Sequence, residues 1–274
     1  MALKVYRFEW FYHPDKDEQW FAEERNRSTS DAFAAEVLIS YARAASAKVF
    51  TEFTNDHILE GDYQFNPDLP VYRALDFGRT CSALWAQRDS YGRFIFFKEV
   101  VLEPSSTIEL AKTVQSLSYQ YASHVAPPYD TCDPAGNTVS FTANTSDIKI
   151  LNDHGIYPKY DKIQQSKERL MEGISLVKYL LSERNSMARP MIMVSRKGCP
   201  TLVDAFQAGY RYKILKTTNE ILDQIDEKHP YEDVMDCLRY TCMQYSQREA
   251  AKKPINFGAT RFEPTKGYHN RRLR

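Results

Sequence analysis

The chain has 274 residues, of which 43% are hydrophobic, enough for one large domain or for one domain with an appendage. Its 36 basic and 36 acidic residues give a formal net charge of zero, so any contact with DNA has to come from local patches. The apolar runs are too short to span a bilayer, and the N-terminus has no secretory apolar segment, so we expect a cytosolic protein. The five cysteines form no CxxC pair, which argues against a structural zinc site and a disulfide framework.

The N-terminal part predicts a helix followed by a boundary. In residues 29–50, Phe33 and Val37 begin an apolar series at near-helical spacing, typical of an amphipathic helix. Residues 55–70 contain turn-forming residues and two prolines. We therefore place a boundary near residue 66.

After this boundary the pattern changes to strands. Three apolar runs, at 71–78, 81–89 and 93–103, follow one another, and the tip DSYGR at 89–93 is typical of a hairpin turn. Three antiparallel strands in succession are expected. Helices and strands then alternate, which predicts an α/β fold with a mixed central sheet and helices on both faces. The expected helices are 105–122, 147–156, 162–185, 199–209 and 229–247, and the expected strands lie within 127–137, 189–195 and 211–216.

Three aspartates stand where an expected strand ends or a helix begins. Asp76 ends the first strand, Asp133 follows the fourth, and Asp233 begins the last helix. Clustered carboxylates bind hard divalent cations through oxygen. Each aspartate also has an ordinary explanation, because turns and the first turn of a helix both favour acids. Only the three together, in this order, indicate a site.

The last helix can be examined by angle. At about 100° per residue, Asp233 lies about 40° from Cys237, at the edge of the apolar stripe, and Asp236 lies about 100° away, further toward solvent. The two acids are neighbours on one face, three residues apart. The helix therefore directs Asp233 toward the rim of the sheet, with Asp236 behind it. The inward stripe is Val234, Cys237, Leu238, Thr241 and Cys242.

From about residue 71 to 245 the chain resembles the RNase H/RuvC-integrase-like nuclease domain of the large terminase subunit of tailed phages. That family has a strand ending in Asp near a Gly, a hairpin, a helix, and a strand ending in a second acid. Its closing helix follows the pattern H-x-x-x-D-x-x-D-A-x-R-Y, with Cys237 here in place of the usual Ala. The segment 32–53 also resembles the helix that joins the packaging ATPase to the nuclease. The matching positions of the closing motif are His229, Asp233, Asp236, Arg239 and Tyr240.

The resemblance implies a nuclease site and its metals. Asp76, Asp133 and Asp233 would hold two Mg²⁺ or Mn²⁺ ions, and Asp236 would assist as a ligand or as a neighbour of the ligands. One ion would activate the attacking water, and the other would stabilise the leaving 3′-oxygen. The implied function is cleavage of double-stranded DNA concatemers during viral genome packaging, with little sequence preference.

The resemblance also implies partners and a division of the chain. The partners would be double-stranded DNA, the packaging ATPase domain, the portal protein and the small terminase subunit, in the cytoplasm of a bacterial host and without a membrane. Residues 1–66 would form a helical segment toward the ATPase, 67–250 the nuclease domain, and 251–274 a basic flexible tail. No GxxxxGK[ST] phosphate loop occurs in the sequence, so this chain does not contain the motor's ATP site.

Two other functions stay open. A RuvC-like junction resolvase would use the same acids on four-way junctions. A non-catalytic module would use the fold to hold the portal or the ATPase, with the acids serving only as helix caps. A nuclease that is silent until it docks on the motor is a third possibility.

Several further residues have less specific explanations. Asp130 and Asp153 are lesser candidates for the acid site, and Cys132 lacks an identifiable base partner for a nucleophile. Five polar or basic residues are possible contacts for DNA phosphates, although solvated side chains are the commoner explanation. These five are Arg79, Lys162, Ser195, Arg196 and Lys197.

Overall fold

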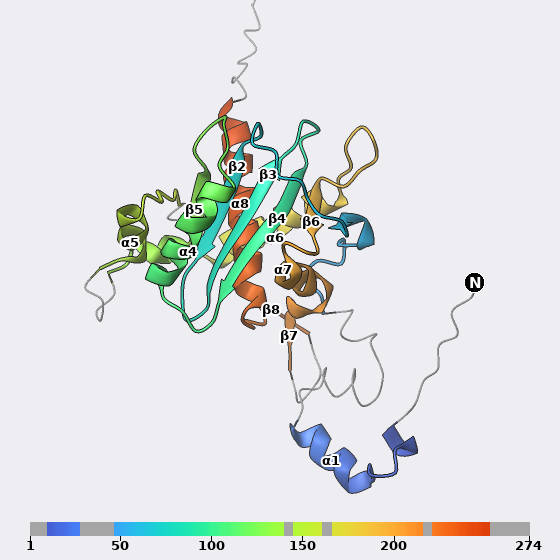
Figure 1. The fold of residues 1–274 in the computed structure, drawn as a ribbon. Helices are drawn as coiled ribbons and strands as arrows, with labels where there is room; N and C mark the ends of the chain where they lie inside the picture. The colour runs from blue at the N-terminus through green and yellow to red at the C-terminus, as the bar shows by residue number, and fades with distance from the viewer. Residues whose placement is uncertain (1–9, 28–46, 140–144, 161–165, 216–220, 253–274) are drawn as a thin grey trace, which may run out of the picture.

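The computed structural model describes residues 10–27, 47–139, 145–160, 166–215 and 221–252 (Figure 1). Most of the helix expected in 29–50, the start of the helix expected at 162–185 and nearly all of the tail 251–274 lie outside the described residues. Before residue 28 the chain forms a short 3-10 helix, Trp10–Tyr12, and helix α1, Glu18–Arg27, neither of which the sequence analysis predicted. Among the described helices, none has the length and apolar character needed to cross a membrane.

A six-stranded mixed sheet forms the centre of the fold. The antiparallel strands β2, β3 and β4 lie side by side, β5 is added parallel to β2, and β6 is added parallel to β4. The predicted mixed sheet with three leading antiparallel strands is confirmed. In spatial order the strands are β1 (Ile58–Leu59), β6 (Ile192–Ser195), β4 (Phe94–Leu102), β3 (Cys81–Arg88), β2 (Val71–Asp76) and β5 (Tyr129–Cys132).

Helices cover both faces of this sheet, as predicted (Figure 1). Successive side chains of a strand point to opposite faces. Ala74 and Leu84 therefore belong to the core beneath one group of helices, whereas Leu75 and Ala83 belong to the core beneath the other. The first group is α6 (Lys167–Ser182), α7 (Pro200–Asp204) and α8 (Tyr231–Lys252), and the second is α4 (Thr107–Gln120) and α5 (Asp147–Asp153).

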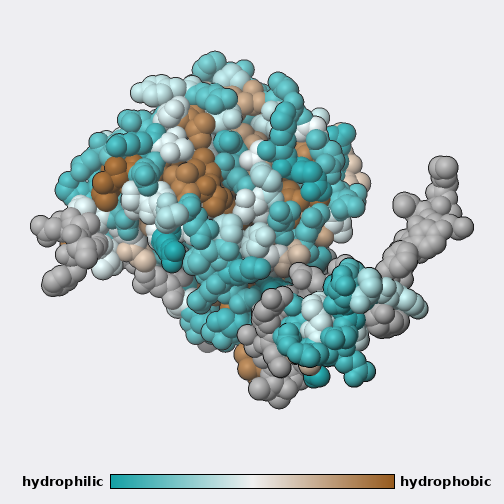
Figure 2. All heavy atoms as spheres, turned by 60° about the horizontal axis from the view of Figure 1, so that its bottom comes forward, coloured by the Kyte–Doolittle hydropathy of each residue, from teal (hydrophilic) through white to brown (hydrophobic). Residues whose placement is uncertain are grey.

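Local sequence signals explain how the helices begin and end. Ser106 caps α4 by accepting a hydrogen bond from the backbone of Glu109, whose side chain accepts one in return from the backbone N–H of Ser106. In α8, the predicted inward stripe from Val234 to Cys242 is buried. The helix expected at 199–209 is α7 continued by a π-helical turn over Ala205–Gly209. On the face seen in Figure 2, hydrophilic side chains surround a few apolar groups.

Two short segments differ from the prediction. Residues 211–216 do not join the central sheet: β7 (Tyr212–Ile214) pairs antiparallel with β8 (Ile221–Ile225) in a separate hairpin. The sequence hides β8 because its centre is the polar pair Asp223 and Gln224, which gives no apolar alternation. Strand β1 has only two residues, too few to show any periodicity.

The core extends into the segment before residue 66. Val49 and Phe50 are buried in the same core as α8, and β1 pairs with β6. The division of the chain at residues 66 and 250 remains a prediction.

Helices α6 and α8 approach closely at Gly173. A Cβ placed there would lie 2.6 Å from Cγ and Cδ of Arg239, whose side chain is buried. We expect Gly173→Ala to lower the free energy of unfolding by about 1–3 kcal/mol, as overpacking does, despite the better helix propensity of Ala. Urea denaturation measures this change. The matched control is Gly61→Ala, where a Cβ meets nothing within 4 Å; equal stability changes in the two variants would contradict the close packing.

Candidate functional site

Asp76 and Asp133 lie side by side at one edge of the sheet. Strands β2 and β5 are parallel, with Leu75 opposite Cys132, so the next residue of each strand is an aspartate. Leu75 and Cys132 face α4 and α5, and the alternation therefore turns both aspartates toward α8. Asp76 is buried, and Asp133 is partly buried and accepts a hydrogen bond from the backbone N–H of Ala135 at 2.9 Å.

Asp233 comes to this edge from the first turn of α8. Its carboxylate is buried, and Nδ1 of His229 lies 2.9 Å from its Oδ2. This hydrogen bond raises the pKa of His229. Burial raises the pKa of Asp233 although His229 opposes the shift, so desolvation outweighs the partner. His229 thus orients the Asp233 carboxylate through this hydrogen bond.

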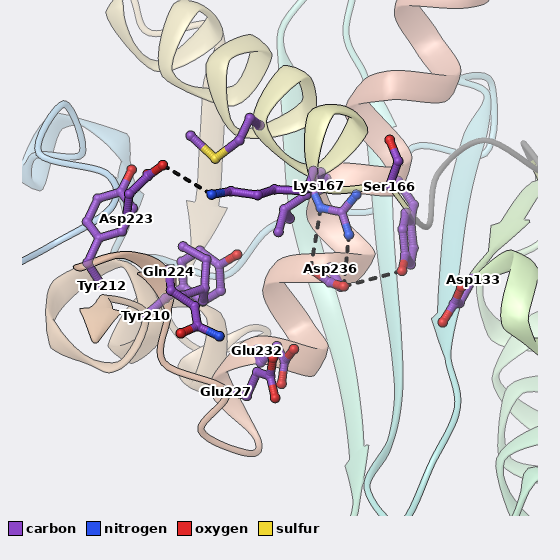
Figure 3. A pocket seen from close by; sticks show the side chains of 15 residues that line it. Asp133, Ser166, Lys167, Tyr210, Tyr212, Asp223, Gln224, Glu227, Glu232 and Asp236 are labelled. Atoms are coloured by element: carbon purple, nitrogen blue, oxygen red, sulfur yellow. Dashed lines mark hydrogen bonds and ion pairs between the residues drawn. The ribbon is translucent and has the colours of Figure 1, made fainter. Parts of the chain in front are cut away.

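Asp236 stands one turn further along α8 and is held by two neighbours. Nη2 of Arg239 lies 2.8 Å from its Oδ2, and the Tyr240 hydroxyl donates a hydrogen bond to the same oxygen at 3.3 Å. Figure 3 shows these contacts with Asp133 facing the same space. Asp236 and Asp133 line a cavity of about 620 Å³ between α6, α8 and the β7–β8 hairpin. The prediction that Asp236 lies further toward solvent than Asp233 is confirmed.

The charges around Asp76 show that these acids form one electrostatic cluster. Burial raises the pKa of Asp76 well above its usual range, and the negative charges of Asp236, Asp233, Asp133 and Glu232 raise it further. Burial also raises the pKa of Asp133. Five carboxylates from β2, the end of β5 and α8 thus lie close enough to influence one another electrostatically. Such a group is costly unless protons or cations balance it.

Glu232 belongs to this cluster, although the sequence analysis did not name it as a site residue. Burial and the charges of Asp236, Glu227 and Asp233 raise its pKa to about 7. Glu232 and Glu227 line the same cavity as Asp236 (Figure 3). A signal was present in the sequence: Glu232 and Asp236 are like charges four residues apart on one helix face, an arrangement that is unfavourable without a binding role.

Other acids and thiols considered in the sequence analysis lie elsewhere. Asp130 faces α4, because it precedes Asp133 by three residues, and Arg73 binds it with two contacts of 2.8 Å. Asp153 forms an exposed ion pair with Lys149 on α5. Burial raises the pKa of Cys132 beyond the range of an ordinary thiol, so it is a packed side chain rather than a nucleophile.

Most of the residues proposed to contact DNA phosphates already have partners within the protein. Arg196 pairs with Glu60 and Lys197 with Asp62, and the Ser195 hydroxyl accepts a hydrogen bond from Gly198 N–H. Arg79 is exposed in the turn between β2 and β3, shortly after Asp76. Lys162 lies outside the described residues.

The donor chemistry of the cluster fits hard divalent cations, because carboxylate oxygens are the ligands that Mg²⁺ and Mn²⁺ prefer. The carboxylates are too far apart in this structure to share an ion. In the described part of the chain, no three His, Cys, Asp or Glu side chains stand close enough together to hold one. Repulsion between uncompensated carboxylates, and the pairing of Asp233 and Asp236 with cationic partners, account for this spacing. The shared charge and burial of the cluster still favour a cation site, because rotation of side chains can shorten the distances between the carboxylates.

The cluster makes the stability of the protein depend on pH. The folded-state pKa of Glu232, about 7, lies above its value of 4.5 for a free side chain. The native state thus binds protons more tightly, and stability falls as the pH rises from about 4.5 through 7. We expect Glu232→Gln to be more stable than wild type at pH 8 by on the order of 1 kcal/mol, since solvent screens this partly exposed group, and equally stable at pH 4. Chemical denaturation at both pH values tests this, and a variant less stable at pH 8 would contradict it.

Comparison with known proteins identifies the fold. No family model and no curated protein matches the sequence. Solved structures do match. The nuclease domain of the P22 large terminase is 16% identical, with a TM-score of 0.51 over 75% of this chain and 94% of that domain. The large terminase nuclease of thermophilic phage G20c is 16% identical, with a TM-score of 0.50 over 72% of this chain and 98% of that one.

A longer relative shows how much of a terminase this chain spans. The large terminase of another thermophilic bacteriophage is 14% identical, with a TM-score of 0.53, and 86% of this chain covers 54% of that protein. The chain therefore has the RNase H-like fold of large terminase nuclease domains and spans about half the length of that large terminase. At these identities the likeness establishes the fold.

Proposed function

We propose that this chain is the nuclease part of a phage large terminase and cuts double-stranded DNA during genome packaging. The observation that carries the proposal is the buried Asp76, surrounded by Asp133, Asp233 and Asp236 at one edge of a sheet with the terminase nuclease fold. Raised pKa values at Asp76, Asp133 and Asp233, with a cavity beside Asp133, are typical of a functional site.

Asp76, Asp133, Asp233 and Asp236 would hold two Mg²⁺ or Mn²⁺ ions. Bound there, the ions would lower the pKa of the attacking water and stabilise the leaving 3′-oxygen. The residues of the chain orient these ligands: His229 holds Asp233, and Arg239 with Tyr240 holds Asp236. The burial of Asp76 excludes water from one side of the cluster, which strengthens its attraction for a cation.

The open cavity beside Asp133 and Asp236 has room for a DNA backbone next to the carboxylates. Since the chain carries no net charge, we expect weak binding to free DNA and strong dependence on partners. These partners would be the packaging ATPase domain, the portal protein and the small terminase subunit, in the host cytoplasm. Residues 1–66 would connect to the ATPase, 67–250 would form the nuclease domain, and the basic residues of 251–274 would bind DNA or another packaging protein.

The experiment that tests this function compares substrates and metals. The purified chain is incubated with supercoiled plasmid, linear duplex or a four-way junction, in Mn²⁺, Mg²⁺ or EDTA. We expect nicking and linearisation of plasmid with Mn²⁺ or Mg²⁺ and none with EDTA. Cleavage of junctions far above duplex would instead establish a resolvase. A protein that cuts nothing and binds no Mn²⁺ would be a non-catalytic module.

A further inference from the structure

The hydroxyl of Ser82 is buried and has no hydrogen-bond partner. Ser82 is 0% exposed, and its Oγ is without a partner in the described structure. An unpaired buried hydroxyl costs about 1–3 kcal/mol relative to a paired one. Ser82 is the second residue of β3, so its backbone is fixed by the sheet. The orphaned hydroxyl therefore needs an explanation.

Its position relative to Asp76 offers one. Ser82 and Asp76 are direct partners in the β2–β3 pairing. The Cβ atoms of such partners lie about 4.5–5.5 Å apart on the same face of the sheet. That face is covered by α8, because the even-numbered neighbours Ala74 and Leu84 pack in its core and Cys237 Sγ lies 3.8 Å from the Ser82 carbonyl oxygen. The Ser82 side chain thus stands beside the Asp76 carboxylate.

The other three aspartates of the cluster each have a hydrogen-bond donor, whereas no described side chain donates to Asp76. Asp133 accepts from the backbone of Ala135, Asp233 pairs with His229, and Asp236 pairs with Arg239 and Tyr240. The neighbouring groups that shift the pKa of Asp76 are all acidic, and none of the described side chains donates a hydrogen bond to its carboxylate. A buried donor without an acceptor therefore stands opposite a carboxylate to which no described side chain donates.

We propose that Ser82 is a positioning residue whose hydroxyl donates a hydrogen bond to one oxygen of Asp76 while the other oxygen holds a divalent cation. This inference rests on the proposed function. A rotation about χ1 of Ser82 or Asp76 is enough to form the bond, because the backbone pairing already places them together. Partners of this kind orient ligand carboxylates, and their loss costs about 10–100-fold in metal affinity.

Calorimetric titration with Mn²⁺ tests the proposal without relying on cleavage. We expect Ser82→Ala to bind Mn²⁺ about 10-fold more weakly than wild type. Its metal-free melting temperature should stay equal or rise, because the variant removes an unpaired buried hydroxyl. Ser82→Thr keeps the donor and should recover most of the affinity, and Ser82→Ala should have no further effect in an Asp76→Asn background.

The matched control is Thr80→Val. Thr80 is also buried and its Oγ1 also lacks a partner, but it lies outside the β2–β3 pairing, so Mn²⁺ affinity should not change. If wild type binds Mn²⁺ and Ser82→Ala binds it equally well, the proposed role of Ser82 is wrong, whereas the nuclease proposal stands. If wild type binds no Mn²⁺, the metal site fails, and the inference about Ser82 fails with it.

Discussion

Replacing Asp76 by Asn should abolish metal-dependent cleavage and at the same time stabilise the metal-free protein. Asp76 is buried among four acids that all raise its pKa, so its ionised form is unfavourable until a cation binds. Asn keeps the shape and removes the charge. We expect the cleavage rate in Mn²⁺ to fall by more than about 100-fold, because loss of a ligand should exceed the effect of losing a neighbour of a ligand.

The stability measurement separates this result from misfolding. In EDTA at pH 8 the melting temperature of Asp76→Asn should lie above that of wild type. Since the native state binds the Asp76 proton more tightly than the unfolded chain, the advantage should disappear as the pH falls below the usual range of a carboxyl group. Mn²⁺ should raise the melting temperature of wild type but not of the variant. A variant that is less stable in EDTA yet still cuts DNA would show that Asp76 has a structural role.

Asp130 lies on β5 and Asp133 directly follows that strand, and the two should respond oppositely to the same substitution. Asp130 is buried and bound by Arg73 with two contacts of 2.8 Å on the α4 face. Burial raises the pKa of Asp130 although Arg73 opposes the shift, but the two-pronged geometry identifies an ion pair. Removing one partner of a buried pair costs about 3–5 kcal/mol, and we expect this loss for Asp130→Asn.

Asp133→Asn provides the matched comparison. It should leave the free energy of unfolding nearly unchanged and eliminate cleavage, whereas Asp130→Asn should retain cleavage at temperatures where it is folded. Replacing both partners, as in Arg73→Met with Asp130→Leu, should destabilise less than Asp130→Asn alone. Urea denaturation and plasmid cleavage measure the two properties. Loss of Mn²⁺ binding in folded Asp130→Asn would place Asp130 in the site instead.

The sequence predicted those parts of the site that local patterns determine. Alternation along β2 and β3, and the helical spacing of α8, were enough to bring Asp76 and Asp233 to one edge of the sheet. The sequence analysis did not specify the pairing of β5 with β2, which puts Asp133 beside Asp76. Helices α4 to α8, the three leading strands and the inward stripe of α8 were predicted correctly, because their signals repeat within a few residues.

The missed features depend on contacts between distant segments. Arg73 and Asp130 are separated by 57 residues, so no periodicity reveals that Asp130 is neutralised. The β7–β8 hairpin lacks apolar alternation, and β1 is only two residues long. The effect of Glu232 on the cluster requires knowing that α8 packs beside β2. These are properties of tertiary packing, which a single sequence encodes only indirectly.

Calorimetric titration of wild type and Asp76→Asn with Mn²⁺ at pH 8 determines whether acids from β2, the end of β5 and α8 form one divalent-cation site. We predict that wild type binds Mn²⁺, because the cation offsets the mutual repulsion of these buried acids. Asp76→Asn should show no binding in the same range. Equal Mn²⁺ binding by both proteins, or none by wild type, would contradict the account.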